Sequence, residues 1–272
     1  MNLKPYRTVS GVLLLLFIIG TGALNEVLGQ LGAWKATMCG VVSANSRLYT
    51  IETNGALYST NLETGRWFQI GKPEFAKTQF LFAVGVSLYT IERDGNFYRV
   101  NQSTGSWIRV GPTGAWKNTI AGTTLDGLLY TVDVSGALYE TNPATGGWRQ
   151  VGRPDFGNTT LMFGAGPSLY TLERDGSLYR INPASGSWSR VGEAGGWRNT
   201  LSGTTLDGRL YTVEATGVLY ETNLATGVWR QVGKSEFGGT RHIFSANGFL
   251  YTIEAGNLYK ISPADGNWKL VS

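Results

Sequence analysis

The 272-residue chain contains little of the chemistry that most enzymes use: it has one cysteine, Cys39, and one histidine, His242. A single cysteine cannot form an internal disulfide, and one cysteine with one histidine cannot supply the ligands of a structural zinc site. A serine–histidine–aspartate triad would depend on His242 alone, and the sequence has neither a Gly-x-Ser-x-Gly motif nor a glycine-rich phosphate loop. The sequence therefore predicts no metal site and no cofactor, and an enzyme is the less favoured class.

Charge is also scarce, because only 15% of the residues are charged and the formal net charge is +4. Without residues 1–30 the chain keeps 21 basic and 18 acidic residues, or +3. The basic residues are scattered and form no run. Nucleic-acid binding needs a concentrated basic surface, so we expect no nucleic-acid partner.

The N-terminus carries the only long apolar run, Val12–Ile19, which follows Lys4 and Arg7. This run is too short for a helix that spans a bilayer, which needs about 20 apolar residues. Small residues at Ala23 and Gly29 offer cleavage points. Residues 1–30 are therefore predicted to be a secretory signal peptide, and the mature chain is predicted to have no membrane span and to be secreted or periplasmic. The alternative is an uncleaved N-terminal anchor.

A repeat dominates the rest of the sequence. The tripeptide Leu-Tyr-Thr occurs six times at intervals of 40 or 41 residues, with its tyrosine at Tyr49, Tyr89, Tyr130, Tyr170, Tyr211 and Tyr251. Each copy is followed by a tryptophan, at Trp67, Trp107, Trp148, Trp188, Trp229 and Trp268. A period of this length, in a sequence rich in glycine, tyrosine, threonine and valine, is typical of β-propeller blades.

Each repeat contains four short runs of β-forming residues, separated by turns that contain glycine. This pattern predicts an all-β protein, a six-bladed β-propeller of four-stranded antiparallel blades over residues 31–272. The predicted blades are about 36–71, 77–111, 118–152, 158–192, 199–233 and 239–272. No terminal strand is visibly exchanged between blades, so we expect the ring to close by packing of blade six against blade one.

The turn before each of these tryptophans begins with a residue whose side chain can bond the backbone two residues on. These residues are Asn61, Asn101, Asn142, Asn182, Asn223 and Ser262. The tryptophan itself is predicted to cover the outer strand of its blade and to pack on the next blade.

The linkers between blades alternate between two forms. One form places Trp34, Trp116 and Trp197, and the other, which reads Glu/Asp-Phe, places Phe75, Phe156 and Phe237. Matching linkers lie 81 or 82 residues apart. The chain thus resembles a two-blade unit present three times, which predicts pseudo-threefold symmetry.

A carboxylate ends the second strand of every blade, on the face of the disc that also carries the linkers: Glu52, Glu92, Asp133, Glu173, Glu214 and Glu254. These acids either bond the backbone of their own turns or pair with a neighbouring arginine, or some of them line a recess for hydroxyls or cations. A catalytic role is the remaining alternative.

The linker tryptophans are the other candidates. Trp34, Trp116 and Trp197 each precede a cation, and Asn118 or Asn199 follows in two of the three copies. An indole beside an amide could hold a sugar ring, because it combines an apolar face with hydrogen-bonding groups. The alternative is that each indole fills the cleft between adjacent blades.

The pattern Val191–Trp197, Gly208–Val213, Leu219-Tyr220 and Trp229–Gly233 resembles the tachylectin-like propeller lectins. That family has five blades of longer repeat and binds N-acetylated amino sugars between blades. The resemblance implies sugar contacts at Trp34, Trp116, Trp197, Asn118 and Asn199. With the carboxylates of the same three blades, the candidate ligand-binding set also includes Glu52, Asp133 and Glu214.

The leading hypothesis from the sequence is an exported, multivalent, lectin-like protein whose partners are glycans or a cell-surface polysaccharide. A second hypothesis is an exported hydrolase or lyase with a carboxylate-lined site at the central channel. A third is a structural or protein-docking disc.

Overall fold

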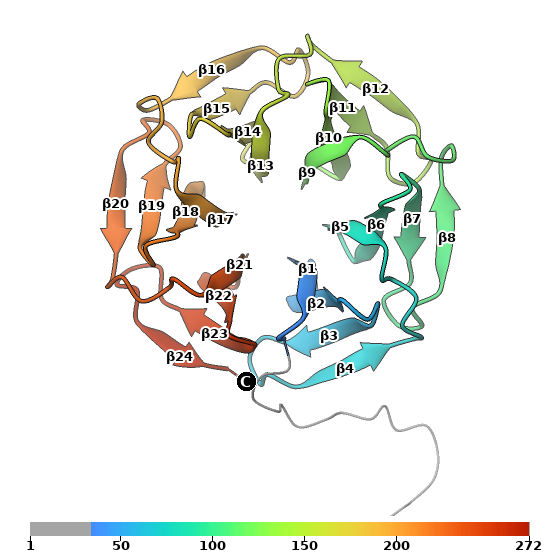
Figure 1. Cartoon of the computed structure of the whole chain (residues 1–272), viewed down its shortest axis with the longest axis horizontal. Helices are drawn as coiled ribbons and strands as arrows, with labels where there is room; N and C mark the ends of the chain where they lie inside the picture. The colour runs from blue at the N-terminus through green and yellow to red at the C-terminus, as the bar shows by residue number, and fades with distance from the viewer. Residues whose placement is uncertain (1–33, 272) are drawn as a thin grey trace, which may run out of the picture.

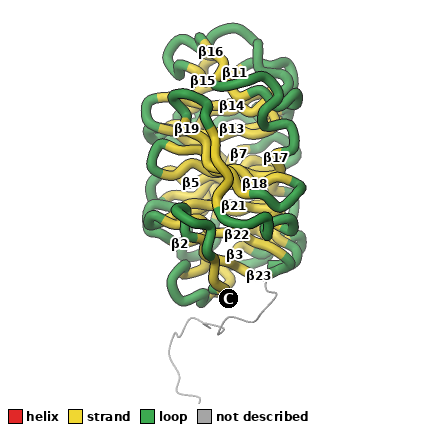
Figure 2. Tube along the Cα trace, turned by 90° about the vertical axis from the view of Figure 1, so that its left-hand side faces the viewer, coloured by secondary structure: helices red, strands yellow, loops and turns green. Residues whose placement is uncertain are grey.

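The computed structural model describes residues 34–271, which form a ring of six four-stranded antiparallel sheets around a central opening (Figure 1). Each sheet uses four consecutive strands, so this part of the chain is the six-bladed β-propeller predicted from the repeat. The predicted signal peptide lies outside the described residues. Seen from the side, the ring is a disc whose turns lie on its two faces (Figure 2).

We number the blades in chain order and call blades 1, 3 and 5 odd and blades 2, 4 and 6 even. The strands of the odd blades are β1 (Thr37–Val42), β2 (Arg47–Glu52), β3 (Leu57–Asn61), β4 (Trp67–Ile70), β9 (Thr119–Leu125), β10 (Leu128–Asp133), β11 (Leu138–Thr141), β12 (Trp148–Val151), β17 (Thr200–Leu206), β18 (Arg209–Glu214), β19 (Leu219–Asn223) and β20 (Trp229–Val232). Those of the even blades are β5 (Thr78–Val84), β6 (Ser87–Glu92), β7 (Phe97–Val100), β8 (Trp107–Val110), β13 (Thr159–Ala165), β14 (Ser168–Glu173), β15 (Leu178–Ile181), β16 (Trp188–Val191), β21 (Thr240–Ala246), β22 (Phe249–Glu254), β23 (Asn257–Ile261) and β24 (Trp268–Leu270).

The first strand of each blade lines the centre of the ring and the fourth lies at the periphery (Figure 1). The second strand is the most buried, as in β2, where Leu48 to Glu52 are all buried. Both faces of this strand are covered by neighbouring blades, which explains its nearly continuous run of large apolar and β-branched residues.

A bulge near the start of the first strand recurs in all six blades. In blade 1, Thr37 pairs with Glu52 and Cys39 pairs with Ile51, so Met38 is the extra residue. A bulge of this kind re-aims the side chains beside it. Here it sets the first threonine of the blade opposite the carboxylate that ends the second strand.

The blades pack through an alternation of large and small residues near the centre. Phe82, Phe163 and Phe244 of the even blades are buried against the glycine of the next odd blade, at Gly122, Gly203 and Gly40. A methyl group added at Gly122 would lie 2.9 Å from Cζ of Phe82, so only glycine leaves room for the ring. The unit that repeats in the packing is therefore a pair of blades.

Each linker is bonded to the blade before it, which ties the blades together. The backbone N–H of each linker aromatic donates to the carbonyl of a glycine in the preceding turn between second and third strands, as Phe75 does to Gly55 at 3.0 Å. Trp34 makes the same bond to Gly256 at 3.1 Å, and this bond joins blade 1 to blade 6. Among the described residues no strand is exchanged, so the ring closes as expected, by one more copy of the interface found between the other blades.

Candidate functional site

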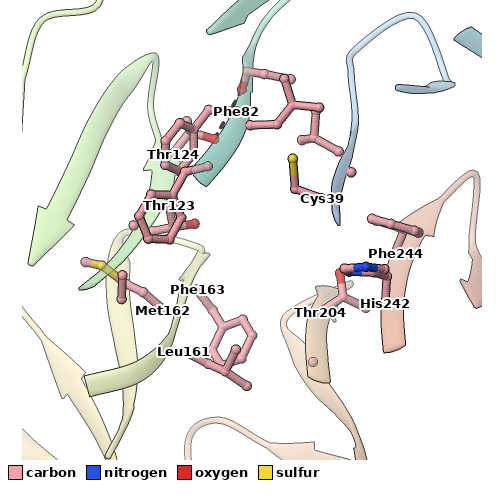
Figure 3. A pocket seen from close by; sticks show the side chains of 18 of the residues that line it. Cys39, Phe82, Thr123, Thr124, Leu161, Met162, Phe163, Thr204, His242 and Phe244 are labelled. Atoms are coloured by element: carbon pink, nitrogen blue, oxygen red, sulfur yellow. Dashed lines mark hydrogen bonds between the residues drawn. The ribbon is translucent and has the colours of Figure 1, made fainter. Parts of the chain in front are cut away.

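The central channel is a cavity of about 520 Å³ that is lined by the first strands of the blades (Figure 3). Its walls are apolar and hydroxyl-bearing, with Phe80, Phe82, Leu161, Thr123 and Thr204 among them. The lining contributed by residues 34–271 includes no aspartate or glutamate. The hydrolase or lyase hypothesis placed its carboxylates in this channel, and this arrangement is wrong because the acids lie elsewhere.

Two titratable groups from neighbouring blades do reach the channel, Cys39 on β1 and His242 on β21 (Figure 3). Burial raises the pKa of the Cys39 thiol to about 12, so the thiol stays protonated and unreactive at neutral pH. Burial also lowers the pKa of His242, whose Nε2 lies 3.3 Å from the carbonyl oxygen of Thr37. Both side chains serve as packing elements of the first strands.

The carboxylates of the second strands lie away from the channel and are bonded within their own blades. Thr37 donates its hydroxyl to Glu52 at 2.6 Å, and Thr159 donates to Glu173 at 2.8 Å. Asp133 accepts instead from the backbone N–H groups of Ser135 and of the following turn. In blades 1, 2 and 4 the bulge thus sets the first threonine of the blade where its hydroxyl donates to the acid.

Three of these acids, Glu52, Glu92 and Glu173, are more than nine-tenths buried. Burial raises the pKa of each above the ordinary glutamate value, and the hydrogen bonds from neighbouring threonines oppose that shift only in part. The second carboxylate oxygen of Glu52, Oε2, is buried without a hydrogen-bond partner.

The predicted tryptophans Trp34, Trp116 and Trp197 are only 4–5% exposed. Each packs in the core between an even blade and the odd blade that follows, and Trp197 donates its indole N–H to the hydroxyl of Thr222 at 3.2 Å. Their ring faces are covered by neighbouring side chains. The structure thus places these three indoles in the cleft between blades.

The exposed aromatic surface belongs to the tryptophans that begin the fourth strands, which the sequence assigned to packing. Five of the six, from Trp107 to Trp268, are 45–53% exposed. Each contacts the third-strand tyrosine of its own blade edge to face, as Trp148 does with Tyr139 at 5.2 Å between ring centroids. The two rings form a corner, an arrangement that leaves one indole face open to solvent.

This corner is one wall of a recess that we call the rim pocket. Its other walls are the linker of the same blade and the second-strand carboxylate. The rim pockets of blades 4, 1 and 3 have volumes of about 410, 210 and 110 Å³. The pocket of blade 1 brings Trp34 and Glu52 together, and that of blade 3 brings together Trp116, Asn118 and Asp133. Trp197, Asn199 and Glu214 hold the same positions in blade 5.

Odd and even rim pockets differ at the indole N–H. In the even blades the acid of the Glu/Asp-Phe linker accepts this hydrogen: Trp107 donates to Glu74 at 3.1 Å, Trp188 to Asp155 at 3.0 Å and Trp268 to Glu236 at 2.9 Å.

In the odd blades the linker has no acid at that position. Nε1 of Trp67 is buried without a partner, and no residue of the described chain accepts from Trp148 or Trp229. In blades 3 and 5 the rim therefore offers a half-exposed indole face and an N–H donor without a partner in the described chain, whereas the N–H of Trp67 in blade 1 is buried.

Residues 34–271 contain no group of three or more histidine, cysteine, aspartate or glutamate side chains placed to hold a metal ion. The same part of the chain has no helix long and apolar enough to cross a membrane.

Comparison with known proteins shows the fold and no family. No protein-family model and no curated protein sequence matches the chain. Many solved structures do match. One is PorZ, described as an essential bacterial surface component of the type-IX secretion system of Porphyromonas gingivalis, with a TM-score of 0.56 and 14% identity over 89% of this chain. Another is the extracellular domain of BT4673 from B. thetaiotaomicron, with a TM-score of 0.59 and 11% identity over 87% of this chain.

The chain spans only 38% and 36% of those two proteins. It covers more, 78%, of the Pan2 WD40 domain of Neurospora crassa, which is matched over 87% of this chain with a TM-score of 0.56 and 10% identity. At these identities the likeness is one of fold, so the chain is a β-propeller similar in architecture to these proteins.

Proposed function

We propose that this protein is an exported, multivalent carbohydrate-binding disc whose ligand sites are the rim pockets of odd blades 3 and 5. The observation that carries the proposal is the half-exposed indole with an unpartnered N–H in these pockets. A pyranose ring offers an apolar C–H face and hydroxyl groups, which suit an indole face flanked by a donor, a carboxylate and an amide such as Asn118.

Two equivalent sites on one rigid ring also fit this function. Linked sites that engage one repetitive surface together gain avidity of about 10² to 10⁴ over a single site. A disc with two weak pockets can therefore hold a polysaccharide firmly without any strong single contact. The predicted signal peptide, and the surface or extracellular placement named for PorZ and BT4673, support export.

A glycan array probed with the chain after the predicted signal tests the proposal, followed by titration of indole fluorescence with each sugar that binds. We expect the double variant Trp148→Ala and Trp229→Ala to lose most of the array signal. The matched control is Trp188→Ala, which removes an even-blade indole of similar exposure and should leave the signal unchanged. An array without hits and no change in fluorescence would remove the proposal and leave a protein-docking disc as the better hypothesis.

A further inference from the structure

The even rim pockets contain their own ligand group. Glu74, Asp155 and Glu236 come from the linkers, 32 or 33 residues before the tryptophans whose N–H they accept, and their carboxylate oxygens lie 2.9–3.1 Å from Nε1. The same contact occurs in all three even blades, so it is a property of the linker type. A carboxylate oxygen is thus the group that the indole N–H of a rim pocket binds in the even blades.

The odd linkers lack that acid and gain a cation. Four residues before the first threonine of the blade, where blade 2 has Glu74, blades 3 and 5 have Ala115 and Gly196. Two residues before that threonine, where the even blades have alanine or glycine, the odd blades have Lys35, Lys117 and Arg198. At these two positions the even linkers therefore carry an acid and the odd linkers a cation.

In blade 3 this cation is part of the pocket, because Lys117 lines it together with Trp148. Asp133, the acid of the same pocket, is already engaged, since its Oδ1 accepts from two backbone N–H groups of its own turn. Lys117 makes no ion pair within the described chain. The pocket of blade 3 thus combines an acid that is already hydrogen-bonded, a cation without an ion-pair partner and an indole N–H without an acceptor.

We infer that the rim pockets of blades 3 and 5 bind a sugar that carries a carboxylate, such as a uronic acid, with that carboxylate taking the place of the missing linker acid on the indole N–H. The inference rests on the proposed carbohydrate function and names its ligand class. The linker cation then neutralises the ligand carboxylate, and the sugar ring lies on the open face of the indole. A hydrogen bond to a charged acceptor is stronger than one to a neutral hydroxyl by an amount that corresponds to about tenfold in affinity.

The first test compares D-glucuronate with D-glucose on the unaltered protein by isothermal titration calorimetry. The two sugars differ only in having a carboxylate or a hydroxymethyl group at C6. We expect two equivalent glucuronate sites and affinity about tenfold weaker for glucose. Equal affinity for the two sugars would overturn the inference and leave the carbohydrate proposal standing.

The second test introduces the acid of the even-blade linkers at the equivalent positions of two odd blades. The double variant Ala115→Glu and Gly196→Glu should cap Trp148 and Trp229, and we expect glucuronate stoichiometry to fall from two to zero. The matched control is Val86→Glu, which adds a negative charge at an exposed position between β5 and β6 and should keep both sites.

Two glucuronate sites in the double variant would overturn the inference, because the linker acid would then not compete with the ligand. If neither sugar nor any glycan of the array binds the unaltered protein, the carbohydrate proposal fails and takes this inference with it. The comparison of the two sugars does not depend on the variants, so it holds even if a variant does not fold.

Discussion

Odd and even blades share similar strand lengths, turns and hydrogen-bonded linkers, yet they differ in two places, near the central channel and at the rim of the disc. Near the channel, even blades place a phenylalanine where the following odd blade has only glycine, as at Phe82 and Gly122. At the rim, even blades cap the indole N–H of their tryptophan with a linker acid, and odd blades leave that N–H without a partner in the described chain. Blades with the same backbone can thus differ in a few side chains that determine how they pack on their neighbours. Other side chains determine which rim pockets are filled by the chain itself.

The largest expected effect is on the interface between blades 6 and 1, which closes the ring. Phe244→Ala removes the ring that packs on Gly40 between blades 6 and 1, and Phe82→Ala removes the equivalent ring between blades 2 and 3. Each truncation should cost about 3–5 kcal/mol of unfolding free energy, because it leaves a cavity in a packed core. Equilibrium denaturation followed by circular dichroism measures both. A much smaller loss for Phe244→Ala would show that the closing interface is not equivalent to the internal one.

The small side of the same contact is tested by Gly122→Ala. The new methyl group would lie 2.9 Å from Phe82 and 3.1 Å from the carbonyl oxygen of Tyr130, so we expect a loss of about 1–3 kcal/mol from overpacking. Gly157→Ala is the control, since a methyl group there meets no atom closer than 3.6 Å. Denaturation midpoints that shift equally in the two variants would contradict size complementarity between the blades.

At the rim, substitution of tryptophan by phenylalanine separates capped from open pockets. Trp188→Phe loses the hydrogen bond to Asp155 and should cost about 0.5–1.5 kcal/mol. Trp148→Phe removes an N–H with no partner in the described chain, so thermal unfolding should barely change. Equal destabilisation by the two substitutions would mean that the linker acid does not stabilise the even blades.

The smallest expected effect is a pH dependence carried by the buried acids Glu92 and Glu173 of the even blades. Burial raises the pKa of each in the native state, whereas the unfolded chain has the ordinary value. The native state therefore keeps protons that the unfolded chain releases, and stability falls as pH rises from the ordinary glutamate pKa through the raised one. Above the raised pKa no further loss is expected.

The double variant Glu92→Gln and Glu173→Gln should flatten this slope in urea unfolding measured from pH 4 to pH 7, whereas Glu63→Gln, on an exposed turn, should keep it. A slope that survives in the double variant would assign the pH dependence to other groups.

Much of the fold could be read from the sequence because its determinants are local. The Leu-Tyr-Thr repeat sets the buried second strand, and asparagine side chains fix the turns as predicted, as when Asn61 accepts from the N–H of Glu63 at 2.9 Å. The alternating linkers gave the two-blade period in the same way. These features depend on residues close together in the chain.

The candidate site was harder to predict because it depends on contacts across a blade. Whether an indole is covered depends on its neighbours in space, so the sequence pattern alone could not separate the buried Trp116 from the half-exposed Trp148. The capping of Trp107 by Glu74 joins residues 33 positions apart. Its signal was present in the sequence, since an acid precedes the linker aromatic in even blades only, but its meaning required the geometry.

The alternation of phenylalanine and glycine around the channel has an arithmetical consequence. A pattern with a period of two closes without a mismatch only on a ring with an even number of members. The loss or gain of one blade would set two large or two small faces against each other somewhere on the circle. Evolution of this chain by duplication or deletion should therefore proceed in steps of two blades, about 81 residues at a time.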